Sequence, residues 1–83
     1  MSKFTVQFLT RDQCSLCDVA RPLVEKATNR LGFDIVEIDV DSSADLKAEY
    51  DTRVPVVLGP DGGVIAEGRI EWRDLNRRLR RLR

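Results

Sequence analysis

The chain has no histidine, and it has only two cysteines among its 83 residues. Without histidine, nucleophilic catalysis that depends on a histidine base is excluded within this chain. A mononuclear zinc site needs about four ligands, and two cysteines do not readily supply them. The sequence therefore predicts no metal site.

Long apolar runs and excess charge of one sign are also missing. No segment could cross a bilayer, and the start has no apolar core for a signal peptide, so we expect a cytoplasmic protein without membrane contact. Fourteen basic side chains balance fourteen acidic ones, which predicts no general attraction to nucleic acid. The balance is uneven, because residues 69–83 hold seven arginines against Glu71 and Asp74, a net charge of +5.

What is present is a regular alternation of strand and helix patterns. Alternating apolar residues predict a strand over residues 4–9. Apolar residues at helical spacing, Leu16 and Val19 among them, predict a helix from Ser15 to Gly32. Residues 34–40 alternate again, and this strand should run parallel to the first because a helix separates them.

The second half predicts a short helix, a hairpin and a last helix. Ser42 followed by Asp45 resembles a capping box, which predicts a helix that stops near residue 51. Residues 54–58 and 64–67 flank a turn-forming Gly-Pro-Asp-Gly-Gly segment, a hairpin signal. Residues 72–82 form an amphipathic helix with arginines on its outer faces. The order βαβαββα predicts an α/β fold with a mixed four-stranded sheet flanked by three helices.

The two cysteines occupy a distinctive place in this order. Cys14 follows the first strand, and Cys17 lies in the first turn of the next helix, where backbone N–H groups and the helix dipole favour a thiolate at Cys14. The spacing allows the sulfurs to bond while Cys17 points inward and Cys14 faces solvent. This indicates that Cys14 attacks and Cys17 resolves. A structural disulfide is the alternative interpretation, although it would close a very short loop and constrain the unfolded chain little.

These residues resemble the small glutaredoxin-like and thioredoxin-like redoxins, over nearly the whole chain. Cys14-Ser15-Leu16-Cys17 follows the first strand as in that family, and Val54-Pro55-Val56 occupies the place of its cis-proline loop, which faces the dithiol. The resemblance implies a thioredoxin-like fold, a single domain over residues 1–83 and a cis bond at Pro55.

The resemblance also implies candidate substrate-binding residues, namely Arg11, Val54, Pro55 and Gly68. Arg11 stands where glutaredoxins commonly carry a lysine that contacts glutathione. Gly68 is what remains of the Gly-Gly-Asp segment with which glutaredoxins hold the γ-glutamyl end of glutathione. Because Arg69 follows it, we expect glutathione to bind weakly and a protein reductase to be the better partner.

The sequence thus predicts a monomeric thiol–disulfide oxidoreductase of cell redox homeostasis and electron transport. Cys14 would form a mixed disulfide with a protein substrate, and Cys17 would release the product, without any cofactor. Glutathione or a reductase of the thioredoxin-reductase type would restore the dithiol. Two alternatives stay open: a non-catalytic binding module that holds an acidic partner or RNA with its arginine-rich last helix, and an iron–sulfur carrier that bridges a cluster between two chains through Cys14.

Overall fold

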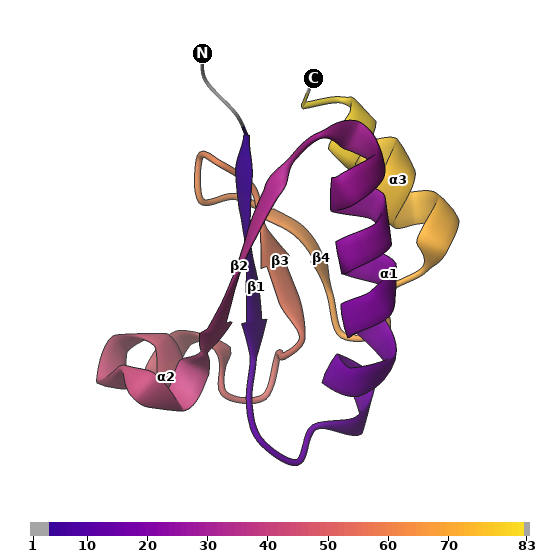
Figure 1. Cartoon of the computed structure of the whole chain (residues 1–83). Coiled ribbons are helices and arrows are strands. Elements are labelled where there is room, and N and C mark those ends of the chain that lie inside the picture. The colour runs from indigo at the N-terminus through magenta and orange to yellow at the C-terminus, as the bar shows by residue number, and fades with distance from the viewer. Residues whose placement is uncertain (1–3, 83) are drawn as a thin grey trace.

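The structure is a computed structural model that describes residues 4–82 (Figure 1). Four strands, three α-helices and one 3₁₀ helix follow one another in the order β1 (Thr5–Thr10), α1 (Ser15–Leu31), β2 (Asp34–Asp39), η1 (Val40–Ser42), α2 (Ala44–Tyr50), β3 (Val56–Leu58), β4 (Val64–Glu67) and α3 (Trp72–Arg80). The predicted order βαβαββα is confirmed. Residues 1–3, in the segment considered for a signal peptide, and Arg83, the last of the seven arginines, lie outside the described residues.

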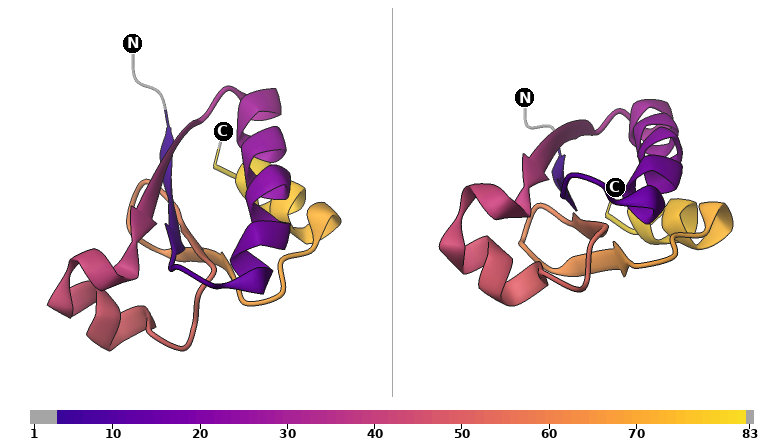
Figure 2. Two further views of the ribbon diagram at one scale, coloured as in Figure 1. Left: turned by 60° about the horizontal axis from the view of Figure 1, so that its bottom comes forward. Right: turned by 90° about the horizontal axis from the view of Figure 1, so that it is seen from below.

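The strands form one mixed sheet in the order β2-β1-β3-β4. β1 pairs in parallel with β2, as the intervening helix α1 predicts, and antiparallel with β3. β4 returns antiparallel beside β3, which completes the predicted hairpin. The hairpin therefore pairs with β1 through β3, and β2 and β4 are the two edge strands of the sheet (Figures 1 and 2).

Helices cover both faces of the sheet. α1 and α3 lie side by side on one face, and α2 packs against the other (Figures 1 and 2). The first face is the larger core, in which Val6, Phe8 and Val57 meet buried residues of both helices. Because neighbouring strand residues point to opposite faces, Leu9 and Val56 belong to the smaller core below α2.

The helix ends follow local chemistry. α1 ends at Gly32, which adopts a left-handed conformation with φ 75° and donates its N–H to the carbonyl of Asn29 at 3.3 Å. The predicted cap of α2 was wrong by one residue, because Ser43 and not Ser42 accepts the hydrogen bond from Leu46 N–H, at 3.4 Å. Ser42 instead donates its hydroxyl to the Asp39 carbonyl within η1.

No helix within residues 4–82 is long and apolar enough to span a membrane.

Candidate functional site: a dithiol at the start of α1

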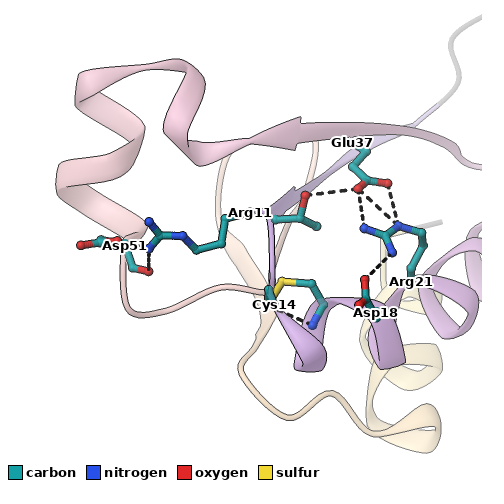
Figure 3. Close-up of a disulfide and its surroundings, with 8 residues drawn as sticks. Arg11, Cys14, Asp18, Arg21, Glu37 and Asp51 are labelled. Carbon is teal, nitrogen blue, oxygen red and sulfur yellow. Dashed lines mark hydrogen bonds and ion pairs between the residues drawn. A yellow bond between two sulfur atoms is a disulfide. The ribbon is translucent and has the colours of Figure 1, made fainter.

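The two cysteines lie where α1 begins (Figure 3). Cys14 is the N-cap residue, Cys17 lies in the first turn, and the two form a disulfide with their Cα atoms 5.2 Å apart. The preceding residue, Gln13, has a left-handed backbone with φ 56°, which turns the chain sharply between β1 and α1. Cys17 is fully buried, so its predicted inward orientation is confirmed, whereas Cys14 is half-buried and thus the more accessible of the two.

The start of α1 also offers polar stabilisation to the sulfur of Cys14. The backbone N–H of Cys17 donates to Cys14 Sγ at 3.1 Å. When the disulfide is reduced, this donor and the partial positive charge of the helix N-terminus favour the anionic form of the thiol. The geometry at this helix start is therefore the one that the predicted role of Cys14 as attacking thiolate requires.

The proline loop reaches the same end of the sheet. The Val54–Pro55 peptide bond is cis, as the resemblance implied, and Pro55 is buried. Leu9 pairs with Val56, so Pro55 lies beside the carboxyl end of β1, the end that leads to Cys14. Gly68, with φ 70°, donates its N–H to the Pro55 carbonyl at 2.8 Å. Val54, Pro55 and Gly68 are thus brought together next to the dithiol end, and their roles in binding stay predictions.

The side chain of Arg11 does not point toward the disulfide (Figure 3). Its guanidinium bonds the Asp51 carboxylate and, at 2.9 Å, the Asp51 carbonyl, and it pairs with Asp41 at 3.2 Å. Figure 3 shows the side chain directed toward Asp51 and away from the disulfide. The hydrogen bond that Arg11 donates to Asp51 and the nearby carboxylates raise the pKa of Arg11 above its ordinary value. A substrate anion would have to displace these partners, and the predicted role of Arg11 therefore competes with an existing structural one.

A second polar cluster beside the disulfide gave no signal in the sequence. Arg21, one turn after Cys17, donates to Glu37 of β2 through Nε at 3.1 Å and a terminal nitrogen at 2.8 Å. Glu37 also accepts from the Thr10 hydroxyl at 3.2 Å, and Arg21 pairs with Asp18 at 3.0 Å. The hydrogen bonds from Arg21 are the main cause that lowers the pKa of Glu37. This cluster fastens the first turns of α1 to β2.

Two apolar side chains near the dithiol lie outside the core. The helical spacing placed Leu16 and Val19 in the buried stripe of α1, but they are 39% and 65% exposed. The reason is the orientation of α1, because its buried face carries Cys17, Ala20 and Val24, and Leu16 and Val19 lie outside that face. An apolar surface therefore flanks the Cys14–Cys17 pair.

Known proteins similar to this chain share its architecture. A structural-genomics target protein from X. campestris superposes with a TM-score of 0.76 at 29% sequence identity, over 92% of this chain and 96% of that one. Thioredoxin 1 from Thermosipho africanus superposes with a TM-score of 0.72 at 20% identity, over 94% of this chain and 92% of that one. The thioredoxin-like fold is thereby confirmed.

The sequence comparisons agree with the structural ones. Uncharacterized proteins of Mycobacterium bovis and Mycobacterium tuberculosis are each 40% identical to this chain over 63 residues, which is 70% of this chain. The match spans 65% of the length of those relatives. A model of the family described as glutaredoxin-like domain (DUF836) matches residues 5–81. By this match, which includes the dithiol, the proline loop and all three helices, the chain belongs to the glutaredoxin-like domain family.

Proposed function

We propose that the chain is a thiol–disulfide oxidoreductase that reduces disulfides in protein substrates. The observation that carries the proposal is the unequal environment of the two cysteines. Cys14 is the reachable one and accepts a backbone hydrogen bond at its sulfur, whereas Cys17 is fully buried. An accessible, stabilised thiolate beside a protected partner is what a two-step exchange requires.

The exchange uses each cysteine once. The Cys14 thiolate attacks one sulfur of the substrate disulfide, a mixed disulfide forms, and the other substrate sulfur leaves as a thiolate that takes a proton from water. Cys17 then loses its proton and attacks Cys14 Sγ, which releases the second substrate thiol. Two electrons pass to the substrate, and the chain ends with the Cys14–Cys17 disulfide.

A protein is the substrate class that the surroundings favour. Exposed Leu16 and Val19 leave an apolar surface beside the dithiol, and such a surface gains from burial under a partner. The proline loop borders the same end of the sheet. A small disulfide would cover little of either feature.

The electron donor that we propose is a protein reductase, with glutathione a weak alternative. Glutathione would need a cation near the dithiol, and the cation predicted for it, Arg11, is already engaged by Asp41 and Asp51. At the other end of the site, Glu67 is paired with Arg53 at 3.0 Å, and the exposed Arg69 follows Gly68. We further propose that the chain acts as a monomer in the cytoplasm, because a disulfide reductase needs a reducing pool to regenerate its dithiol.

The two serine variants test the proposal. Cys14→Ser should abolish reduction of a protein disulfide such as that of insulin, whereas Cys17→Ser should accumulate a mixed disulfide visible by mass spectrometry under non-reducing conditions. Ser15→Ala, which changes the intervening sequence and spares both sulfurs, is the matched control. Equal partial activity in the two cysteine variants would contradict the assigned roles.

A further inference from the structure

A basic patch covers the outer surface shared by α1 and α3. Trp72, the first residue of α3, lies at its centre, with Lys26 Nζ 5.4 Å and Arg30 Cζ 5.8 Å from the centre of its ring. Beside it is a pocket of about 340 Å³ that is lined mainly by arginines. We define the basic patch as Trp72 together with the cations Lys26, Arg30, Arg73, Arg77, Arg80 and Arg81.

The positive charge of this patch is nearly uncompensated. Three arginines outside the patch are held by carboxylates: Arg11, Arg21 and Arg53 each form two ion pairs. Within residues 4–82, Arg77 is the one cation of the patch that forms an ion pair, and its partner is Asp74. The spacing of the arginines on α3 also sets like charges one turn apart, which opposes helix formation.

Helix dipoles explain only part of this arrangement. Arg30 lies in the last turn of α1 and Arg80 in the last turn of α3, where a cation is favourable. Arg73 lies at the opposite end of α3, near the helix N-terminus, where a cation is unfavourable. The positive charge of the patch is therefore not explained by the stability of the two helices alone.

The structure of the patch favours an acidic peptide over a single-stranded nucleic acid as its ligand. Single-stranded nucleic acid sites combine cations with open aromatic faces on which bases stack, but Trp72 is half-buried and its ring is already approached by Lys26 and Arg30. α3 has nine residues and is about 13 Å long, which matches two or three carboxylates spaced about 7 Å apart along one side of an extended peptide. Since residues 1–68 carry a net charge of −5, a longer polyanion would also meet repulsion outside the patch.

We propose that the basic patch is a docking surface for an acidic segment, rich in aspartate and glutamate, of a protein partner. Guanidinium groups bind carboxylates through paired hydrogen bonds, so several exposed arginines on one helix face can hold such a segment in register. Cys17 and Arg30 are about 20 Å apart along α1, which leaves the dithiol open while the segment is bound. The proposal goes beyond the oxidoreductase function and does not require the dithiol to be active.

The chain contains its own reporter, because Trp72 is its only tryptophan. The full chain is titrated at low ionic strength with a short peptide of alternating glutamate and serine, and Trp72 fluorescence is recorded. A peptide of alternating glutamine and serine and a single-stranded oligothymidylate with the same number of negative charges serve as comparison ligands. We expect saturable binding of the glutamate peptide alone, weakened by added salt.

Charge-matched variants make the titration specific. Arg30→Gln/Arg80→Gln should bind the glutamate peptide about fivefold to tenfold more weakly. Lys47→Gln/Arg69→Gln removes the same charge outside the patch and should bind as the original chain does, with circular dichroism verifying that both variants fold. Equal weakening in both variants, tighter binding of the oligonucleotide, or no saturable binding of the glutamate peptide would each overturn the proposal.

Discussion

Glu37→Gln removes one charge from the cluster that fastens α1 to β2 and keeps the shape of the side chain. Glu37 accepts from both Arg21 and Thr10, and Arg21 lies one turn beyond Cys17. The substitution replaces a bidentate ion pair by a hydrogen bond from the charged guanidinium to one neutral amide oxygen, so the attraction between two charges and one acceptor oxygen are lost. We expect the folded state to lose stability at neutral pH.

The expected loss is modest because the pair is partly exposed. The side chain of Arg21 is 33% accessible and that of Glu37 is 41% accessible, so solvent screens the attraction. Arg21 also keeps Asp18 as a partner at 3.0 Å in the variant. A well-oriented exposed pair contributes up to about 1 kcal/mol, so the free energy of unfolding should fall by about 0.5–1 kcal/mol and Tm by about 2–8 °C.

The sign of the pH dependence follows from the carboxylate. The folded chain lowers the pKa of Glu37 below its ordinary value of 4.5, mainly through the hydrogen bonds from Arg21. The stabilisation is therefore complete above that ordinary value and is lost as the pH falls through the lower, folded pKa. The gap between the original chain and Glu37→Gln should be full at neutral pH and should close in strong acid.

Urea denaturation of the oxidised protein, followed by Trp72 fluorescence, measures this gap. Glu25→Gln is the matched control, since Glu25 is an exposed glutamate of α1 that forms no ion pair within residues 4–82. If Glu37→Gln is no less stable than Glu25→Gln at neutral pH, or if the gap widens on acidification, the assigned role of the cluster is refuted.

Three further predictions concern the dithiol and the groups around it. In the reduced, folded protein, iodoacetamide should label Cys14 and leave Cys17 unlabelled, as mass spectrometry can establish. The pH dependence of the labelling rate should give a thiol pKa below about 8.5, and preferential labelling of Cys17 would reverse the roles. Arg11→Ala should change turnover in a glutathione-coupled assay less than about twofold, because the guanidinium is occupied by carboxylates, and a complete loss would reinstate it as a glutathione contact. Gly68→Ala should lower the free energy of unfolding by about 1–2 kcal/mol, because φ is 70° there and no atom lies within 4 Å of an added Cβ. Gly32→Ala is the control, because Gly32 has φ 75° and likewise no atom within 4 Å of an added Cβ. The two variants should lose similar stability, but Gly68→Ala should reduce insulin more slowly than Gly32→Ala.

Elements with strong periodicity and a clear end were predictable from the sequence. α1 begins at Ser15 and is capped at Gly32, as the pattern predicted. A glycine directly after an apolar helical stripe indicates a helix end, because glycine adopts the left-handed cap conformation at little cost. β4 spans the predicted residues 64–67. The third strand begins at Val56 and not at residue 54, because Pro55 has no N–H to give to a ladder and lies in the cis-proline loop instead.

Features that depend on distant partners were not predictable. Arg11 meets Asp51 across 40 residues and Arg21 meets Glu37 across 16, and no local pattern encodes either pair. Leu16 and Val19 are exposed because the sheet meets the face of α1 that carries Cys17, and the broad apolar spacing of the helix did not separate this face from its margins. The sequence predicted Ser42 as the cap of α2, but the hydroxyl of Ser42 is used within η1, and Ser43 caps the helix instead.

One helix, α1, contributes to the electrostatics of both proposed sites. The N-terminus of α1 carries partial positive charge beside Cys14, and its C-terminus carries partial negative charge beside Arg30. The effect of each terminus fades within about one turn, and at physiological salt charges are screened over about 8 Å, whereas Cys17 and Arg30 are about 20 Å apart. A change in the basic patch should therefore leave the pKa of Cys14 in place. Docking and disulfide exchange are for this reason separable, so failure of the acidic-peptide titration leaves the oxidoreductase proposal intact, and an inactive dithiol leaves the docking proposal intact.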